Sequence, residues 1–317
     1  MKYYIGVDGG GTKTAVSIAS ADSSHLMSEV TGSAAWREFG VDNVIKRIKT
    51  VIDDFQLSES GEIAAIAMGL PCYGESEAGD CELLRAFTNI FYGVPLYLTN
   101  DAEVGWAGSL SLSPGVSVVA GTGSIAYGKD DFGNTTRCGG WSEFFSDEGS
   151  CYWIGRKVLQ LFSRQADGRT PKDELYSIVR KEFNINNDFE IIDLVHTEYI
   201  SNREKVASLQ LIAKEAALVG SCSARNLYID AAGRLCDMVI AIRDQLQFKK
   251  QPFPVSYSGG LFKAGDLILP YFNENITAIG GVPVTPKYEP VHGAVLLAFE
   301  QNCPEGLPGL LKRLDEL

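Results

Sequence analysis

The sequence predicts an α/β protein built from two domains. Its 317 residues exceed what one hydrophobic core usually organises. Segments typical of strands alternate with segments typical of helices, which is the pattern of α/β folds. In addition, a strand, a glycine-rich turn and a second strand occur twice, with the turns at residues 9–14 and 121–124. This repetition indicates two related halves, each offering a glycine hairpin to a shared cleft.

The first half is predicted to span residues 1–113. Short apolar runs rich in β-branched residues predict its strands, and apolar residues three and four positions apart predict its helices. The strands are expected at residues 3–8, 15–19, 63–68 and 95–99. The helices are expected at residues 41–55, 83–91 and 102–110. The run Ser-Leu-Ser-Pro-Gly at residues 111–115 ends this half, because Pro and Gly beside Ser favour a connecting loop.

The second half is predicted to span residues 114–294 and to be mostly helical. The same patterns of apolar residues identify its elements. The strands are expected at residues 116–120, 125–128 and 254–257. The helices are expected at residues 149–162, 172–183, 202–219, 224–248 and 292–300, followed by a polar tail.

Composition and charge exclude several classes of function. Hydrophobic residues make up 45% of the chain and the net charge is -12, so the surface repels nucleic acid and anionic lipid. No apolar run is long enough to span a membrane, and the chain begins on a strand-like segment rather than a signal peptide. The seven cysteines are dispersed without a Cys-x-x-Cys pair, which argues against a zinc site or a complete disulfide framework. We therefore expect a cytoplasmic protein with free thiols.

The first glycine turn has the composition of an anion-binding hairpin. A Walker A loop and a dinucleotide fingerprint both require a helix after the glycines, whereas a strand follows here. Glycines let backbone N–H groups approach an anion closely, and Thr12 adds a hydroxyl donor. Asp8, at the end of the preceding strand, is a candidate ligand for a metal ion beside the phosphates. The alternative is a plain tight turn, and the second turn in the equivalent position favours the anion site.

Asp101 lies where a predicted strand ends and a predicted helix begins, the usual place for functional groups in α/β folds. A carboxylate there can accept the proton of a hydroxyl, which accelerates its reaction by roughly two to four orders of magnitude. Alternatively, Asn100 or Asp101 caps the following helix. Taken alone, the residue favours the capping role.

Two loops of the second half also have the composition of binding sites. One contains Trp141 and Asp147, and carbohydrate sites use this mix of a stacking face and a charged acceptor. Asp147 or Ser150 could instead cap the next helix, which is compatible with binding. The other loop contains Gly259 and Gly260 after a strand, where a purine or ribose could lie against the backbone.

Six short motifs occur in a fixed order along the chain. They are Asp-Gly-Gly-Gly-Thr-Lys-Thr at 8–14, Asn-Asp-Ala at 100–102, Ala-Gly-Thr-Gly-Ser at 120–124, Gly-Gly-Trp at 139–141, Asp-Glu-Gly-Ser at 147–150 and Ser-Gly-Gly at 258–260. Together they resemble the BadF/BadG/BcrA/BcrD ATPase family, and within it the N-acetylglucosamine kinase branch of the actin and hexokinase superfamily. The resemblance implies two ribonuclease H-like (actin-like ATPase) domains with an ATP cleft between them. It also implies that a C-terminal helix, at about residues 295–317, returns to the first domain.

The same resemblance implies an activity and its residues. Asp101 matches the catalytic base of an ATP-dependent kinase that phosphorylates a hydroxyl of an amino sugar such as N-acetylglucosamine or glucosamine, with Mg2+ at Asp8. A homodimer is expected, because dimers are frequent in the family. The expected sugar contacts are Asp101, Ser124, Gly140, Trp141 and Asp147. The expected nucleotide contacts are Gly9, Gly10, Gly11, Thr12, Lys13, Gly121, Thr122, Gly123, Gly220, Gly259, Gly260 and Lys263.

Two positions depart from the kinase pattern. Family members often carry an asparagine in the loop where this chain has Ala34 and Ala35, and another after the second glycine turn, where it has Ile125. Each lost amide contact weakens the recognition of a sugar hydroxyl or acetamido group by roughly one kcal/mol or more. The sugar is therefore left open among glucosamine, another hexosamine and a cell-wall fragment.

Two other functions compete with the kinase. One is an activator ATPase of the same family, which needs cysteines that meet across a dimer axis to hold an iron–sulfur cluster, and Cys138 and Cys151 are the nearest candidates. The other is a non-catalytic ATP-binding switch or a transcriptional regulator. The regulator is disfavoured by the lack of a helix-turn-helix segment, a basic N-terminal extension and a clustered cysteine motif.

Overall fold

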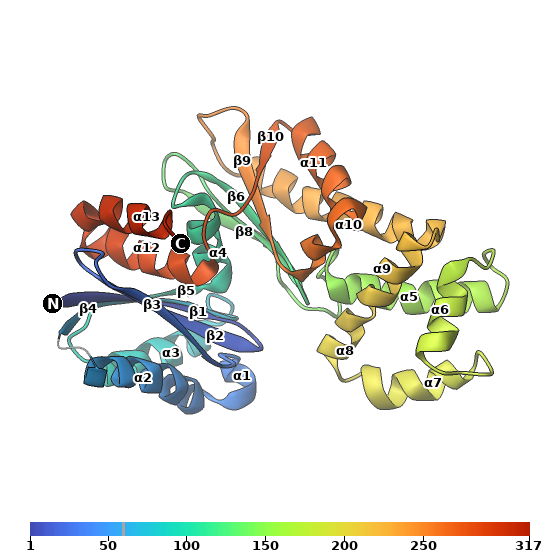
Figure 1. The fold of residues 1–317 in the computed structure, drawn as a ribbon, viewed down its shortest axis with the longest axis horizontal. Helices are drawn as coiled ribbons and strands as arrows, with labels where there is room; N and C mark the ends of the chain where they lie inside the picture. Colours follow the sequence, from blue (N-terminus) through green and yellow to red (C-terminus); the bar gives the residue numbers. More distant parts are fainter. Residues whose placement is uncertain (59–60) are drawn as a thin grey trace. The chain divides into compact units, whose positions relative to one another are not determined.

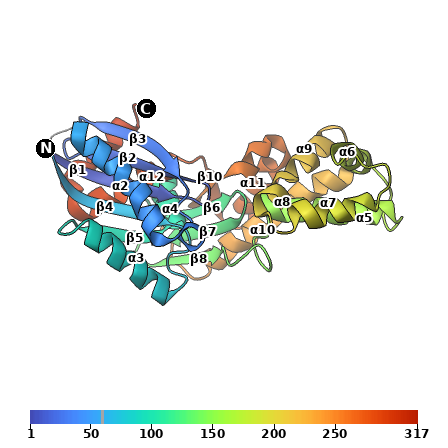
Figure 2. The same ribbon diagram turned by 90° about the horizontal axis from the view of Figure 1, so that it is seen from below.

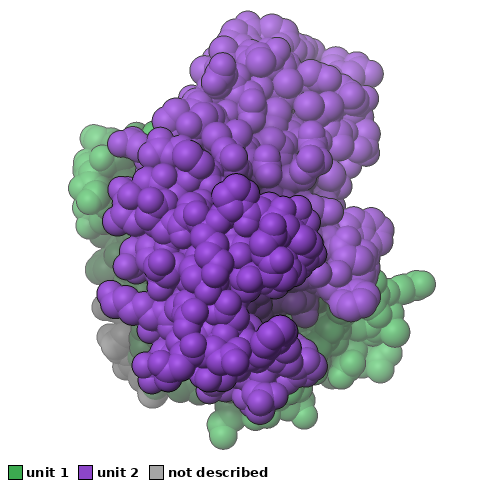
Figure 3. Space-filling model, turned by 90° about the vertical axis from the view of Figure 1, so that its right-hand side faces the viewer, with its two compact units in different colours: residues 1–113, 285–317 green, residues 114–284 purple. Residues whose placement is uncertain are grey.

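The computed structural model describes residues 1–58 and 61–317. They form two compact units, one made of Met1–Ser113 with Thr285–Leu317 and the other of Pro114–Val284 (Figure 3). The chain returns to unit 1 after Val284, earlier than the residue 295 expected from the sequence. The reason is that the whole of α12 (Pro290–Asn302) packs on α4 (Asp101–Leu110). A side chain at Gly293 would overlap the carbonyl of Val104, so the two helix backbones are in close contact.

Unit 1 is organised around a five-stranded mixed sheet in the order β3-β2-β1-β4-β5. Strand β1 pairs antiparallel with β2 and parallel with β4. The strands are β1 (Lys2–Gly9), β2 (Lys13–Ser20), β3 (Leu26–Gly32), β4 (Glu62–Leu70) and β5 (Leu96–Asn100). Four of these were predicted. The edge strand β3 was missed because nearly all of its residues are exposed, so that it lacks the apolar alternation of a half-buried strand.

Helices cover both faces of this sheet (Figure 1). Tyr3 points to the face covered by α2 and α3, and its ring lies 4.8 Å from that of Phe55. The next residue, Tyr4, points to the opposite face, where its ring lies 4.4 Å from that of Phe299 on α12. Seen from below, α2 and α3 lie across the strands (Figure 2). The helices of unit 1 are α1 (Trp36–Phe39), α2 (Val41–Ser58), α3 (Glu77–Ile90), α4, α12, η3 (Pro304–Gly306) and α13 (Leu307–Leu314).

Unit 2 repeats the sheet of unit 1. Its order is β10-β9-β6-β7-β8, with β6 antiparallel to β7 and parallel to β9. The strands are β6 (Gly115–Ala120), β7 (Ser124–Lys129), β8 (Thr135–Gly139), β9 (Phe253–Ser258) and β10 (Gly281–Val284). The two related halves that the sequence indicated are therefore confirmed as two copies of one strand arrangement. The outer strands β8 and β10 were missed, because β8 carries few apolar residues and β10 has only four residues, one of them Pro283.

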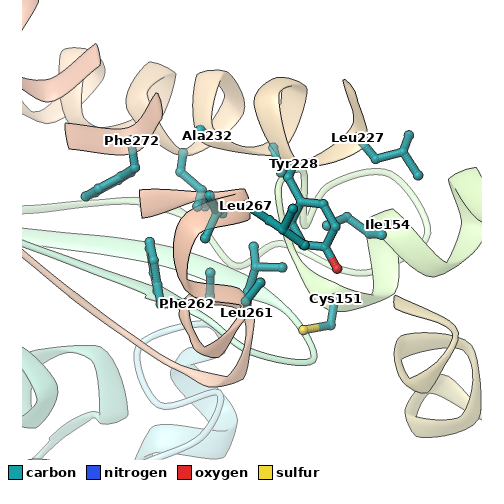
Figure 4. Packing of buried hydrophobic residues seen from close by; sticks show 14 of the residues in the cluster. Cys151, Ile154, Leu227, Tyr228, Ala232, Leu261, Phe262, Leu267 and Phe272 are labelled. Atoms are coloured by element: carbon teal, nitrogen blue, oxygen red, sulfur yellow. The ribbon is translucent and has the colours of Figure 1, made fainter. Parts of the chain in front are cut away.

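The helices of unit 2 lie mainly between β8 and β9 and form a layer that extends beyond the strands (Figure 2). Tyr228 and Ala232 on α10 pack with Ile154 on α5 and with Leu261 and Phe272 in one apolar core (Figure 4). The helices are α5 (Cys151–Ala166), α6 (Glu174–Glu182), α7 (Glu190–Leu194), η1 (Val195–Tyr199), α8 (Arg203–Ser208), α9 (Gln210–Leu218), α10 (Cys222–Arg243), η2 (Gly260–Leu267) and α11 (Leu269–Ala278).

Several helix predictions need correction. The helix expected at residues 224–248 ends at Arg243. The helix expected at residues 202–219 is two helices, α8 and α9, separated by Leu209, whose N–H donates to the carbonyl of Val206 three residues before it. The helix expected from residue 149 begins at Cys151, because the side chain of Ser150 caps it by accepting a hydrogen bond from the Trp153 N–H. The polar tail includes the helix α13, whose Leu310 and Leu314 are buried. Among the helices of the described residues, none is both long and apolar enough to cross a bilayer.

Candidate active site

Asp8 lies at the carboxyl end of the central strand of unit 1. It pairs with Ala15 on β2 and with Gly69 on β4. Side chains of a strand alternate between faces, so Asp8 shares the face of Tyr4 and Gly6. That face is covered by α12, since a side chain at Gly6 would overlap Val295. Asp8 therefore lies on the side of the sheet where α4 and α12 pack.

Asp101 is the first residue of α4, directly after β5. The cap of α4 is Asn100, whose Oδ1 accepts a hydrogen bond of 3.0 Å from the Ala102 N–H. The capping role that the sequence left open between the two residues thus belongs to Asn100. Helix α4 approaches the sheet closely at Gly69, where a Cβ atom would lie 3.1 Å from the Cα of Asp101. Because Gly69 pairs with Asp8, the two aspartates lie side by side.

The electrostatics of Asp8 reflect this crowding. Burial, and then the nearby carboxylates of Asp101 and Glu289, raise the pKa of Asp8 to about 7, whereas Lys13 lowers it. Like charges at short range disfavour ionisation of both groups unless a proton or a cation is shared between them. Asp8 can therefore keep a proton near neutral pH, and a bound divalent cation would relieve the same repulsion. Glu289, which immediately precedes α12, was missed by the sequence analysis because no motif surrounds it.

The first glycine turn joins β1 to β2 as predicted. The Gly10 N–H donates to the carbonyl of Lys13 at 2.9 Å, which leaves Gly11 and Thr12 exposed at the tip. The Ala34 N–H donates to the carbonyl of Gly10 at 3.0 Å, and Ala34 is fully buried. A Cβ atom at Gly9 would lie 2.8 Å from the Ala34 Cβ. The loop with Ala34 thus packs directly beneath the turn and leaves little space for a larger side chain.

The second glycine turn joins β6 to β7 in unit 2. The Gly121 N–H donates to the carbonyl of Gly123 at 2.9 Å, and the carbonyls of Gly121 and Thr122 accept from the first two N–H groups of α5 at 2.9 and 3.2 Å. The turn is therefore fixed to the start of a helix. Gly259 has a φ of +105°, and a side chain there would overlap the carbonyl of Ala120. Since β6 and β9 are neighbours, the structure brings this turn together with Gly259 and Gly260.

The loop after β8 lies against the same turn. The Gly140 N–H donates to the carbonyl of Ser124 at 3.0 Å, and the Ser124 hydroxyl donates to the carbonyl of Glu148 at 2.8 Å. A Cβ atom at Gly140, where φ is +70°, would lie 2.8 Å from the Ile125 side chain. Ile125 thus places an apolar surface beneath the loop. Trp141 follows with 75% of its surface exposed, so its indole is available to a ligand.

Asp147 is buried at the end of this loop, with only 2% of its surface exposed. Its φ of +61° is unusual for a residue with a side chain. One carboxylate oxygen accepts from the Ser124 N–H at 3.3 Å and the other from the Arg203 guanidinium at 2.6 Å. Burial raises the pKa of Asp147, and Arg203 opposes this shift. Arg203 was missed by the sequence analysis, because it lies in an unremarkable charged helix 56 positions further along the chain.

Two predicted nucleotide residues lie further along unit 2. Gly220 stands between α9 and α10 with a φ of +113°. Lys263 lies in η2 with its side chain exposed, and its carbonyl accepts from Lys214 Nζ on α9 at 3.2 Å. Helix α9, which ends just before Gly220, therefore contacts η2, which begins at Gly260.

Comparison with known proteins identifies the family. Residues 5–298 match the model of the BadF/BadG/BcrA/BcrD ATPase family. The chain belongs to this family. Two curated relatives are similar over 94% of this chain and 98% of their own length. They are the N-acetylmuramic acid/N-acetylglucosamine kinase of Clostridium acetobutylicum, at 26% identity, and the N-acetyl-D-glucosamine kinase of Dictyostelium discoideum, at 27%.

Solved structures agree on the fold. A candidate N-acetylglucosamine kinase from Chromobacterium violaceum is 25% identical, with a TM-score of 0.75 over 94% of this chain and 99% of that one. A second candidate N-acetylglucosamine kinase, from Porphyromonas gingivalis, has a TM-score of 0.65 at 15% identity, over 95% of this chain and 99% of that one. The ROK hexokinase of Thermus thermophilus has a TM-score of 0.55 at 14% identity, over 93% and 98%. The predicted α/β fold with two ribonuclease H-like, actin-like ATPase units is confirmed.

Proposed function

We propose that this BadF/BadG-family protein is an ATP-dependent kinase that phosphorylates a hydroxyl of an amino sugar such as N-acetylglucosamine or glucosamine. The observation that supports it best is the position of Asp101, at the start of α4 beside Asp8, with the capping role taken by Asn100. Two relatives that match along nearly their full length are named as kinases of N-acetylated amino sugars. Similarity at this level supports a sugar kinase and leaves the sugar to be measured.

In the proposed reaction, Asp101 accepts the proton of the sugar hydroxyl as that hydroxyl attacks the γ-phosphate of ATP. General base catalysis of this kind contributes roughly two to four orders of magnitude. The rest of the barrier falls through positioning and neutralisation of charge, since the transition state of phosphoryl transfer is loose. Asp101 is suited to this role because helix α4 holds its backbone against Gly69 of the sheet.

Asp8 is the residue that would hold Mg2+. No group of three or more potential ligands is present among the described residues, but Mg2+ is commonly held by one or two carboxylates together with the phosphates of a nucleotide. The crowding that raises the pKa of Asp8 fits this role, because a cation would relieve the repulsion between Asp8, Asp101 and Glu289. When bound, Mg2+ would neutralise charge on the phosphates.

The two glycine turns are proposed to hold the phosphates of ATP through backbone N–H groups. In unit 2, the turn that contains Gly121, Thr122 and Gly123 is supported by α5 and lies beside Gly259, so that its backbone is preorganised. The exposed tip at Thr12 would have the same role in unit 1. Gly220, Gly260 and Lys263 remain predicted nucleotide contacts, and a homodimer remains a prediction.

The sugar would be held by the loop that carries Trp141 and Asp147, together with Ser124 and Gly140. Two positions at which family members often carry asparagine are apolar in this chain. Ile125 packs against Gly140, and Ala34 is buried under the first turn. Neither residue offers an amide to a sugar hydroxyl, and Ile125 adds an apolar surface beneath Gly140. We therefore expect the preferred amino sugar to differ from the one favoured by an amide-lined site, with an N-acyl or ether substituent as a candidate.

The structure offers an argument against the activator ATPase. That function needs two cysteines whose thiols reach a surface shared with a partner. Cys151 is buried in the core of unit 2, where it packs with Ile154 and Tyr228 (Figure 4). Burial also raises the pKa of the Cys151 thiol to about 11, which disfavours the thiolate that binds iron.

The experiment that tests the kinase is ADP release from purified protein with MgATP and a panel of amino sugars. The panel should contain N-acetylglucosamine, glucosamine, N-acetylmuramic acid and N-acetylmannosamine. We expect turnover that depends on the sugar, and an Asp101→Asn variant that has lost it. ADP release without any dependence on a sugar would contradict the proposal and favour an ATPase.

A further inference from the structure

Arg203 is joined to the proposed sugar loop by two carboxylates. Its Nη2 lies 2.6 Å from Oδ2 of Asp147, and its Nε lies 3.7 Å from Oε2 of Glu143. The guanidinium also lies over the second glycine turn, since a side chain at Gly123 would overlap Nη2. Arg203 therefore touches the two places in unit 2 that the proposed function assigns to sugar and phosphate.

The backbone that carries Arg203 is held firmly. Arg203 is the first residue of α8, and a side chain at Gly155 on α5 would overlap the carbonyl of Val206, so that the two helices pack backbone to backbone. Val206 and Ala207 are buried. Helix α5 itself begins with Cys151, whose N–H donates to the carbonyl of Gly121. The glycine turn, α5 and α8 are thus packed together, and this packing fixes the position of the Arg203 guanidinium.

The charges around Arg203 indicate that it acts through Asp147. The N-terminus of a helix carries a partial positive charge, which disfavours a cation at this position unless acidic groups compensate. Asp147 and Glu143 supply two negative charges against one positive charge. A site with this balance does not attract a further anion, which argues against a direct role in binding phosphate. The guanidinium group is planar and carries several N–H donors, so it is well suited to fixing the orientation of a carboxylate.

We propose that Arg203 is a positioning residue that keeps Asp147 ionised and aimed at the hydroxyls of the sugar. Ser124 N–H and Arg203 each hold one oxygen of the carboxylate, and each oxygen retains a second lone pair for a hydroxyl. Among the described residues, Arg203 and Glu143 are the charged groups that shift the pKa of Asp147, and burial would otherwise keep the carboxyl protonated to higher pH. The inference rests on the proposed kinase function.

The test compares three variants in the sugar-dependent ADP assay. Arg203→Gln removes the positive charge, and Arg203→Lys keeps the charge but not the planar guanidinium group. The control, Lys205→Gln, removes a cation on the same helix that pairs with Glu198. We expect Arg203→Gln to raise the KM for the sugar about tenfold or more, with kcat and the KM for ATP changed less than about threefold. Arg203→Lys should recover part of the loss, and Lys205→Gln should behave as the wild type.

The pH dependence separates positioning from a structural role. Without the guanidinium, the pKa of Asp147 moves further upward, so the KM for the sugar in Arg203→Gln should rise as the pH falls from 8 to 6. The wild type should change less over this range. Suppose that the wild type turns over sugar and that the KM of Arg203→Gln for the sugar is unchanged and independent of pH. That result would overturn the inference about Arg203 but not the proposed function. Absence of sugar turnover in the wild type would overturn the proposed function and the inference with it. If Arg203→Gln fails to fold, as seen by thermal melting, the KM for the sugar in Arg203→Lys decides, and a value equal to that of the wild type would overturn the inference.

Discussion

The two units of this protein have the same strand arrangement but place different chemistry at equivalent positions. In each, the first strand is central, pairs antiparallel with the second and parallel with the fourth, and ends in a glycine turn. Asp8 is the last residue of β1 that pairs with β4, and Val119 is the last residue of β6 that pairs with β9. Unit 1 thus has a carboxylate where unit 2 has an apolar side chain.

The helices inserted into each arrangement differ as well. Between the third and fourth strands, unit 1 has α1 and α2, whereas unit 2 has the series from α5 to α10. Those helices hold the second glycine turn through α5 and Asp147 through α8. The comparison teaches that the same strand arrangement can carry different functional groups. Unit 1 places the carboxylates of Asp8 and Asp101 at its strand ends, and unit 2 places a glycine turn and the buried carboxylate of Asp147 there.

The largest expected effect is on kcat, and it concerns the acidic residues that come after the fifth strand of each sheet. Asp101 follows β5 and Glu289 follows β10 before α12. We expect Asp101→Asn to lower kcat for the best sugar by roughly 10²- to 10⁴-fold, because the base is lost. Glu289→Gln should lower kcat by less than about tenfold. Equal losses, measured by sugar-dependent ADP release, would mean that the assignment of the base to Asp101 is wrong.

The second prediction concerns the backbone of unit 2. Gly259→Ala places a side chain at a φ of +105° and against the carbonyl of Ala120, so we expect a loss of about 2 kcal/mol or more in the free energy of unfolding. Its neighbour Gly260 has open space around it, so Gly260→Ala should change stability by less than about 0.5 kcal/mol. Urea denaturation measures both. Similar stabilities for the two variants would contradict the close packing of β9 on β6.

The third prediction uses the elevated pKa of Asp8. The folded-state pKa of about 7 exceeds the ordinary value of 3.8, so the folded state keeps a proton that the unfolded chain loses between pH 4 and 7. At about 1.4 kcal/mol per pKa unit, ionising this group costs the wild type roughly 4 kcal/mol of stability above pH 7. Asp8→Asn should therefore gain thermal stability over the wild type as the pH rises from 5 to 8.

The control for this experiment is in unit 2, where Val119→Ala changes the equivalent position without changing charge. Its stability relative to the wild type should not depend on pH over the same range. A constant difference between Asp8→Asn and the wild type from pH 5 to 8, in melting temperature, would show that Asp8 ionises normally. The contrast drawn between the two strand ends would then not hold.

The smallest expected effect is at the exposed loop. Trp141→Ala should raise the KM for the sugar about five- to tenfold, which corresponds to about 1 kcal/mol of stacking, and leave the melting temperature unchanged because the side chain is exposed. Phe144→Ala removes another exposed aromatic side chain from the same loop and should leave the KM unaltered. Sugar titrations at saturating ATP measure both values. Equal KM values for the two variants would argue that the indole does not touch the sugar.

The sequence was most informative where chemistry depends on short motifs. The glycine turns, the Asn100-Asp101 junction and the paired Gly259 and Gly260 were all found by reading along the chain, and the structure places each at the end of a strand. Exposed or short strands were missed, because they lack a periodic apolar face. Arg203 was missed for a different reason. Its partner lies 56 residues away, and no local pattern records a contact across that distance.

By itself, the sequence determined the inner strands of each sheet with their glycine turns, the family and the candidate base. These follow from local propensity and from motifs whose spacing is set by neighbouring residues. The tertiary structure decided that Asn100 rather than Asp101 caps α4, that Asp8 meets Asp101 and Glu289, and that Asp147 is held by Arg203. Each of these depends on which faces of strands and helices pack together, and packing joins residues that are distant in the chain.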